Sequence, residues 1–391
     1  MRSRQTQKLI ALADKTVLIM PSVAIPVYKP SLRGDEARYV KEAIESSWIS
    51  SKGKFIEQFE EQFSRFTGVP YVTSVFNGTV ALHVALAALG IGPGDKVLVP
   101  AFTYVASVNA IRYCGATPVF VDSERDSWQI SLHDLRRKMT SRVRAVMAVH
   151  LYGQACDMPS LADWCRESNL LLIEDCAEAF GTKIGNRHVG SWGDVGTFSF
   201  FGNKTLTTGE GGMVVSGDGK VIDRVRHLKS QGVSPTQEYW HDCVAYNYRM
   251  TNVQAAIGLA QIERAAEILE RKRRIAHLYF ERFAEHGIEV QVEQSGTTHS
   301  FWMVSILARD AAHRHSIRRR LRQDGIETRP AFPPVYRFPM YAELVEDGCG
   351  DSRFPVASFL GDRGINLPSY PDLSDDEVQF IASKTIHAFN A

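Results

Sequence analysis

The sequence has no excess of either charge and no framework of cysteines. Its 391 residues contain 45 Lys and Arg against 44 Asp and Glu, so total charge does not direct the chain towards nucleic acid, a membrane surface or an acidic partner. Its six cysteines form no C-x-x-C pair, which argues against structural zinc and against a secreted disulfide scaffold. We therefore expect reduced thiols, a cytoplasmic location and no metal.

A long apolar run is also missing. The stretch LIALADKTVLIM begins as one, but Asp14 and Lys15 interrupt it, so we expect neither a membrane-inserted segment nor a cleavable leader. The proline-marked segment SVAIPVYKPSL begins the organised chain. Residues 1–25 are expected to form a loosely held extension.

The length and the 44% apolar content predict two or three domains. From residue 71, short β-type runs alternate with helical segments, which predicts an α/β domain with a mostly parallel sheet and helices on both faces. We assign this large domain to residues 26–265 and a smaller α+β domain to residues 266–391, joined by a long helical stretch that starts near residue 250. The seven runs expected as strands are YVTSVF, KVLVPAF, TPVFVD, RAVMAVHLY, LLLIED, VGTFSFF and GMVVSG.

Two other patterns receive structural interpretations. Phenylalanines at 55, 59, 63 and 66 have the spacing of a buried helix face, so they are expected in the core. Arginines at 318–320 and 322 fit a solvated helix face better than a nucleic-acid surface. No nucleic-acid partner is expected.

Lys204 lies in a polar loop bracketed by glycines, GNKTLTTGEGG, directly after the apolar run VGTFSFF. A buried strand at that run would deliver the loop to the carboxyl edge of the sheet, where α/β proteins bind ligands. Most lysines in such loops are simply exposed to solvent. The neighbouring motifs favour a chemical role instead.

Three features are expected to converge on Lys204. Asp175 closes the run LLLIED, and Ser199 lies on the strand before the lysine loop. Gly78 and Thr79 begin a helix, whose free N–H groups bind anions. An amine, a buried carboxylate, a hydroxyl and an anion cradle are what pyridoxal phosphate requires, since the lysine joins the cofactor covalently and the acid pairs with the pyridinium nitrogen.

A nucleotide-binding P-loop is the rival interpretation of GTFSFFGNKT. The P-loop motif has four residues between its glycines and a lysine directly after the second glycine. Here five residues separate Gly196 from Gly202, and Asn203 precedes Lys204. The spacing therefore argues against nucleotide hydrolysis.

Several stretches resemble the sugar aminotransferases of the DegT/DnrJ/EryC1/StrS family. They extend from about residue 26 to the C-terminus, and the lysine loop is the most specific of them. The resemblance implies the pyridoxal phosphate-dependent fold-type I architecture of aspartate aminotransferase, working as a homodimer with active sites at the subunit interface. The matching stretches include FNGTVALHVALAALGIGPGDKVLVPAFTYVASVNAI, LLIEDCAEAFGT, GDVGTFSFFGNKTLTTGEGGMV and YNYRMTNVQAAIGLAQ.

The resemblance also assigns roles in the cofactor site. It makes Lys204 the catalytic lysine and Asp175 the partner of the pyridinium nitrogen. It places Ser199, Gly78 and Thr79 at the phosphate.

Further roles follow from the same resemblance. Tyr104 falls where relatives stack an aromatic ring on the cofactor. Glu178 falls where relatives often have His or Gln near the phenolic oxygen, a departure that requires this carboxyl to be protonated or turned aside. Asn247, with Arg249 as a companion, would reach the phosphate of the neighbouring subunit. Tyr104 could instead be a core tyrosine, and Asn247 and Arg249 could simply cap the long helix.

The activity implied by the resemblance is a ping-pong transamination between L-glutamate and a nucleotide-linked 4-keto-6-deoxyhexose. GDP-4-keto-6-deoxymannose is the first expectation, and UDP- or dTDP-linked sugars stay open. We expect Arg329, Arg337 and Arg33 to be candidates for the pyrophosphate. A related dehydratase would have histidine at the position of Lys204, and a non-catalytic regulator would carry an additional DNA-binding module.

Overall fold

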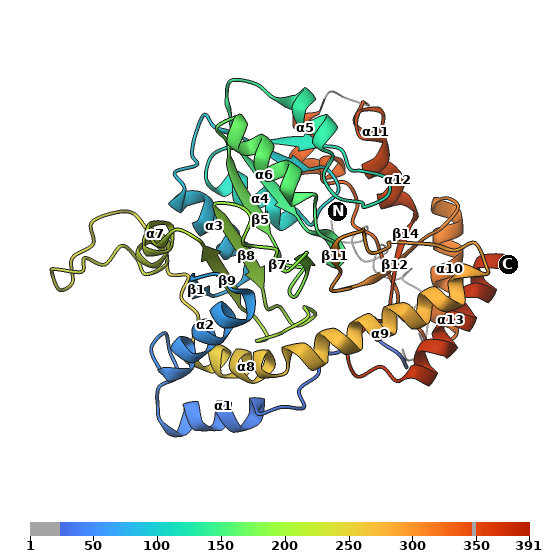
Figure 1. Ribbon diagram of the computed structural model, residues 1–391, viewed down its shortest axis with the longest axis horizontal. Helices are drawn as coiled ribbons and strands as arrows, with labels where there is room; N and C mark the ends of the chain where they lie inside the picture. The colour runs from blue at the N-terminus through green and yellow to red at the C-terminus, as the bar shows by residue number, and fades with distance from the viewer. Residues whose placement is uncertain (1–23, 346–348) are drawn as a thin grey trace, which may run out of the picture.

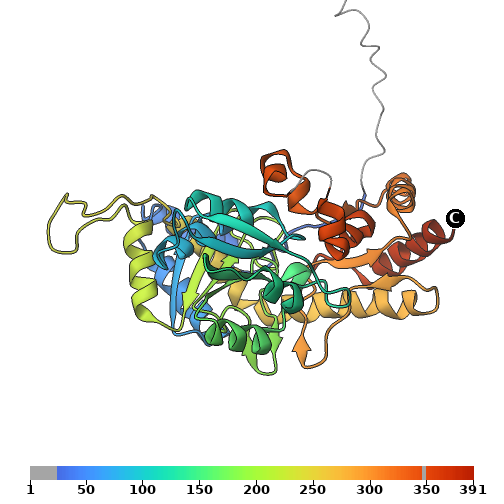
Figure 2. The same cartoon turned by 90° about the horizontal axis from the view of Figure 1, so that it is seen from above.

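The computed structural model describes residues 24–345 and 349–391. Apart from its last two residues, the predicted extension over residues 1–25 lies outside the described residues. Figure 1 shows a large part built around a sheet and a smaller part around β12 and β14. Helix α9 (Ala265–Ala284) extends from the first part to the second in both Figure 1 and Figure 2.

The large part is organised by a seven-stranded sheet with the strand order β1-β9-β8-β5-β4-β2-β3. Strand β9 is antiparallel to both of its neighbours, and the strands from β8 to β3 are parallel to one another. The predicted mostly parallel seven-stranded sheet is therefore confirmed. In chain order the strands are β1 Tyr71–Val75, β2 Lys96–Pro100, β3 Thr117–Val121, β4 Val143–Val149, β5 Leu171–Asp175, β8 Val195–Ser199 and β9 Gly212–Ser216.

Both faces of this sheet are covered by helices, because alternate residues of each strand point to opposite faces. On β9, Val214 packs in one core cluster and Met213 and Val215 pack in another. The first cluster includes residues of α3 (Gly78–Ala88), α4 (Val105–Tyr113) and α7 (Gly219–Lys229). The opposite face is covered by α2 (Lys54–Thr67), α5 (Leu132–Lys138), α6 (Met158–Glu167) and α8 (Asn252–Glu263).

The aromatic stripe of α2 lies in the core, as its spacing predicted. Phe55, Phe59 and Phe63 are fully buried, and Phe66 is partly buried and stacks on Phe180. Burial of each such ring contributes about 2 kcal/mol or more to folding.

The long helical stretch is divided into two helices. Helix α8 ends at Glu263 and α9 begins at Ala265, with Arg264 between them at φ −105° and ψ 10°. No proline or glycine marks this break in the sequence. Arg264 donates hydrogen bonds to Glu267, so its side chain folds back along the start of α9.

The smaller part contains a four-stranded antiparallel sheet with the order β10-β12-β14-β13. Its core also includes α9, α10 (Ala311–Gln323) and α13 (Asp375–Asn390). Ile25 packs in this core, so the first described residues lie against the C-terminal part of the chain. The strands are β10 Glu289–Val290, β12 Val304–Leu307, β13 Arg329–Pro330 and β14 Gly364–Leu367.

The remaining elements connect or flank these two parts. Val335, Tyr336 and Leu360 belong to the core of the large sheet, so the segment between β13 and β14 packs back on the large part. Within the described ranges, no helix is long and apolar enough to span a membrane. The other elements are α1 Glu36–Glu45, η1 Leu151–Gly153, β6 Lys183–Ile184, β7 Arg187–His188, β11 Thr297–Thr298, η2 Val335–Arg337, η3 Pro339–Leu344, α11 Gly350–Arg353 and α12 Pro355–Arg363.

Candidate active site

A cavity of about 400 Å³ lies at the carboxyl ends of β5 and β8, beside the start of α3. Residues of the smaller part, including Trp302 and Asn366, close it from the other side. This is the edge at which parallel α/β sheets bind ligands. The cavity is lined by eight residues expected in the site from sequence: Gly78, Thr79, Tyr104, Asp175, Glu178, Ser199, Lys204 and Arg329.

Lys204 projects into this cavity from a short turn after β8. Its backbone N–H donates to the Phe201 carbonyl at 2.9 Å. Its Nζ lies 3.9 Å from the centre of the Trp302 ring and 3.7 Å from Oε1 of Glu178. Burial lowers the pKa of the amine, and Glu178 and Asp175 partly oppose that shift. A lysine with a lowered pKa is a better nucleophile and proton carrier at neutral pH.

Asp175 is the last residue of β5 and is almost fully buried. Its carboxylate accepts hydrogen bonds from Ser107 Oγ at 2.7 Å and from the Ala177 N–H at 3.0 Å. Burial raises the pKa of this carboxyl, and these two hydrogen bonds together with Lys204 partly oppose the rise. A cationic group placed against Asp175 would stabilise its ionised form.

The start of α3 forms a cradle for an anion. Asn77 caps the helix by accepting from the Val80 N–H at 3.0 Å, while the N–H groups of the first helical residues have no acceptor within the helix. Gly78 allows α3 to approach β8, because a Cβ at this position would lie 2.7 Å from Cβ of Ser199. The Ser199 hydroxyl and the positive end of the helix therefore meet in one place.

Glu178 is buried opposite Lys204. Its Oε2 accepts the backbone N–H of Tyr152 at 2.9 Å, and burial raises the pKa of the carboxyl to about 7. The structure therefore places in the cavity a carboxyl that is partly protonated near neutral pH.

The mouth of the cavity is aromatic and basic. Tyr104 caps the start of α4, is 53% exposed and has its ring 5.4 Å from that of Phe332. Arg329, on β13, is exposed at the same opening.

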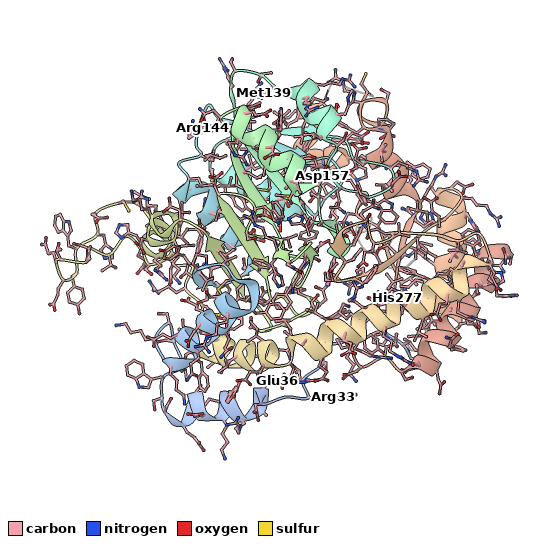
Figure 3. The ribbon with its side chains drawn as sticks, in the orientation of Figure 1. Arg33, Glu36, Met139, Arg144, Asp157 and His277 are labelled. Carbon is pink, nitrogen blue, oxygen red and sulfur yellow. The ribbon has the colours of Figure 1, made fainter. Side chains whose placement is uncertain are left out.

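Four residues predicted from sequence lie outside this cavity: Arg33, Arg337, Asn247 and its companion Arg249. Arg337 pairs with Asp351 and Asp362. Arg33 pairs with Asp372 at 3.1 Å, and Figure 3 shows it near α1 at the margin of the molecule. Asn247 is exposed on the segment between α7 and α8, where it bridges to Ser230 directly after α7.

The structure adds three residues that the sequence had not indicated. Ser107 binds Asp175, Tyr28 OH donates to the Lys204 carbonyl at 2.5 Å, and Trp302 Nε1 donates to the Asn203 carbonyl at 2.7 Å. Ser107 could have been found from its position in the first turn after Tyr104. Tyr28 and Trp302 come from distant segments and carry no local signal.

Comparison with known proteins gives the same architecture and the same chemistry. The family model described as the DegT/DnrJ/EryC1/StrS aminotransferase family matches residues 30–385. The GDP-perosamine synthase of Escherichia coli O157:H7 is 52% identical over 357 residues, which are 91% of this chain and 96% of that protein. The GDP-perosamine synthase of Vibrio cholerae is 52% identical over 368 residues, 94% of this chain and 99% of that protein.

Among solved structures, a putative sugar aminotransferase from Streptococcus pneumoniae in its PMP form superposes with a TM-score of 0.88 at 28% identity. The match covers 94% of this chain and 98% of the other. With the family model matching most of the sequence, the chain belongs to the DegT/DnrJ/EryC1/StrS aminotransferase family.

Proposed function

We propose that this protein is a pyridoxal phosphate-dependent aminotransferase that converts GDP-4-keto-6-deoxymannose to GDP-perosamine. The observation that carries the proposal is the 52% identity to two GDP-perosamine synthases over nearly the whole chain. The cavity supports the class of reaction, because it places a buried amine beside a buried carboxylate and a helix start.

The residues present fit the cofactor. Asp175 is a buried carboxylate in the same cavity as Lys204, and a cationic ring nitrogen would relieve the cost of its burial. Because residue 78 has no side chain, the start of α3 lies close to Ser199, which brings helix N–H groups and a hydroxyl together, as suits a phosphate. When bound, pyridoxal phosphate supplies an aldehyde that captures amines and a ring that accepts the electron pair released at the substrate carbon.

Lys204 is proposed to hold the cofactor and to move the proton that leaves the substrate carbon. It must be neutral for both tasks, and burial favours the neutral amine by lowering its pKa. Glu178 lies 3.7 Å away with a pKa of about 7, so it can take or return a proton near neutral pH. Trp302 packs against the amine and limits the access of water to it.

The two substrates would use the open side of the cavity in turn. Arg329 at the mouth is proposed to bind the pyrophosphate of the sugar nucleotide, where a guanidinium can pair with two oxygens. L-glutamate is proposed as the amino donor. Its amine enters in the first half-reaction and leaves on C4 of the sugar in the second.

A homodimer is proposed to complete the site. Asn247 is exposed between α7 and α8 and lies outside its own cavity, which suits a contact with the phosphate of a second copy. The same segment exposes Tyr239 (97%) and Trp240 (54%), which a partner would cover. The cytoplasm is the proposed location, in agreement with six free cysteines.

Substrate competition tests the proposal. Purified protein supplied with pyridoxal phosphate and L-glutamate should aminate the GDP-linked 4-keto-6-deoxyhexose faster than its UDP- and dTDP-linked counterparts, measured as amino-sugar product by mass spectrometry. A preference for a UDP- or dTDP-linked sugar would replace the proposed substrate and leave transamination intact. Dehydration without amine transfer would overturn the reaction class.

A further inference from the structure

Lys272 is an amine buried inside the smaller part of the protein, on helix α9. Its side chain is fully buried, and its Nζ donates to the carbonyls of Ser369 at 2.6 Å and Trp302 at 3.2 Å. Burial alone lowers its pKa to about 7, so no carboxylate compensates the charge. An unpaired amine in such a place is costly, which points to a role beyond packing.

The ionisable residues on either side of Lys272 are occupied elsewhere. Arg271 binds Asp375, and Arg273 binds Glu293 and the His299 carbonyl. Lys272 also lies 5.4 Å from the centre of the Tyr28 ring. Because these charged neighbours are paired elsewhere, the Lys272 amine contacts two backbone carbonyls and one aromatic ring.

The two carbonyls lie at the ends of paired strands. Trp302 lies shortly before β12 and Ser369 shortly after β14, and Val304 of β12 pairs with Leu367 of β14. The amine thus links the start of β12 to the end of β14, through Trp302, which lines the cavity.

One arm of the contact reaches Lys204 through Trp302. The indole Nε1 of Trp302 donates to the Asn203 carbonyl at 2.7 Å. The ring of the same residue lies 3.9 Å from Nζ of Lys204. The carbonyl that Lys272 holds therefore belongs to the residue that supports the catalytic amine.

A second arm reaches Lys204 through the N-terminal segment. The Ser369 N–H donates to the Val27 carbonyl at 3.4 Å, and the next residue, Tyr28, donates its OH to the Lys204 carbonyl at 2.5 Å. Both supports of the Lys204 turn, one on its side chain and one on its backbone, thus meet at Lys272.

We propose that Lys272 is a positioning residue for amine transfer, which holds Trp302 and Tyr28 so that the Lys204 amine stays in place and shielded from water. Lys272 does not line the cavity and touches neither substrate nor cofactor there. The proposal rests on the function proposed above for Lys204. Without the Lys272 amine, the two carbonyls lose their donor, the indole and the N-terminal segment gain freedom, and water reaches Lys204.

Lys272→Met is the test, because methionine keeps an unbranched chain of similar length and replaces a buried polar group with an apolar one. The loss of the donor to two buried carbonyls should lower stability, so the variant needs a control that also loses a buried hydrogen bond. The matched control is Tyr279→Phe, also on α9, which removes a buried hydrogen bond from Tyr279 OH to the Pro368 carbonyl at 3.0 Å. The acceptor of that hydrogen bond is one residue before Ser369, and the bond involves neither Trp302 nor Tyr28.

The first readout is catalytic and the second is not. In the loaded protein, Lys272→Met should lower kcat about tenfold with an unchanged KM for the sugar nucleotide, since misplacement of a reacting group affects the rate more than binding. In the cofactor-free full-length chain, the rate at which Lys204 is acetylated by an N-hydroxysuccinimide ester is measured against pH by peptide mass spectrometry. In Lys272→Met, the pH midpoint of Lys204 acetylation should rise towards that of an ordinary lysine, because hydration of the amine restores its charged form. The ionisable groups that act on Lys204 are Glu178 and Asp175, and both variants retain them.

The two variants are distinguished by their effect on Lys204. Both should lower the unfolding temperature, because each removes buried hydrogen bonds, but only Lys272→Met should change the Lys204 midpoint and kcat. Wild-type values for kcat and midpoint in Lys272→Met would overturn the proposal. A wild-type protein that shows no visible absorbance band with pyridoxal phosphate would instead overturn the proposed function.

A second variant keeps the test independent of the folding of the first. Trp302→Phe removes the indole N–H that binds Asn203 and keeps an aromatic ring. It should raise the Lys204 midpoint in the same direction, and adding Lys272→Met to it should give little further change, because both act through one contact. A Trp302→Phe protein with a wild-type midpoint would also overturn the proposal.

Discussion

Oε1 of Glu178 lies 3.7 Å from Nζ of Lys204, and both groups are buried in the same cavity. Burial moves their pKa values towards each other, raising that of the acid to about 7 and lowering that of the amine. Each shift weakens the charged form of its own group. Proton transfer between the two groups is therefore easier than between an exposed lysine and an exposed glutamate.

The first prediction concerns the pH dependence of stability. Because the pKa of Glu178 is higher in the folded protein, the folded state binds more protons than the unfolded state between the ordinary value of 4.5 and about 7. The free energy of unfolding contributed by this group is thus highest at low pH and falls through that window, by roughly 3 kcal/mol at most. Glu178→Gln should remove this component, as measured by urea unfolding of the cofactor-free protein at several pH values.

Glu167→Gln provides the control for that measurement, since Glu167 is an exposed carboxylate in the last turn of α6. Its pH dependence should match that of the wild type. An equal loss of stability with rising pH in Glu178→Gln and wild type would show that Glu178 is not the group responsible.

The second prediction concerns Ser107, which binds Asp175 at 2.7 Å. Ser107→Ala should lower kcat about tenfold, because the loss of one hydrogen bond to a buried charge costs about 1.5–3 kcal/mol. Asp175→Asn should cost about a hundredfold or more, since it removes the charge that would pair with the cofactor ring. Single-turnover reaction with L-glutamate, followed by absorbance, compares the two. A larger loss in Ser107→Ala than in Asp175→Asn would contradict the assigned order of the two groups.

The strand ends of the site could be predicted from sequence because the apolar runs stop where polar residues begin. Asp175 and Ser199 are the last residues of β5 and β8, although the run after Val195 had suggested a strand as far as Phe201. The start of α3 at Gly78 could be predicted in the same way, since a glycine and a hydroxyl residue follow a short β run. These features depend on residues that are close together in the sequence, so the sequence predicts them.

The supports of the site could not be predicted, because they depend on contacts between distant segments. Tyr28 and Trp302 reach the Lys204 turn only after the small sheet has packed on the large part. The break at Arg264 was likewise missed, since no proline or glycine marks it. The boundary between residues 265 and 266 stays a prediction.

The third prediction separates two arginines that the sequence could not distinguish. Arg329 lines the cavity, whereas Arg337 is held by Asp351 and Asp362 outside it. Arg329→Ala should raise the KM for the sugar nucleotide about tenfold or more, in line with the loss of a charge-assisted hydrogen bond. Arg337→Ala should leave KM unchanged and lower stability by about 1 kcal/mol, because its partners are largely exposed. Steady-state kinetics and urea unfolding decide between these roles, and a raised KM in Arg337→Ala alone would reverse the assignment.

The fourth prediction concerns the approach of α3 to β8. A Cβ added at Gly78 would lie 2.7 Å from Cβ of Ser199, so Gly78→Ala should push the helix start away from the strand and weaken binding of pyridoxal phosphate. Gly92→Ala is the control, because a Cβ there meets no atom within 4 Å. Binding is measured by titrating the cofactor and following its visible absorbance band.

The double variant Gly78→Ala/Ser199→Gly distinguishes crowding from the loss of a polar contact. Removing the Ser199 side chain makes room for the new methyl group, so the double variant should bind the cofactor more tightly than Gly78→Ala alone. It should still bind more weakly than wild type, because the phosphate has lost the Ser199 hydroxyl. The two substitutions are in contact, so their effects should not add. Additive losses would mean that the short distance between Gly78 and Ser199 does not control the cradle.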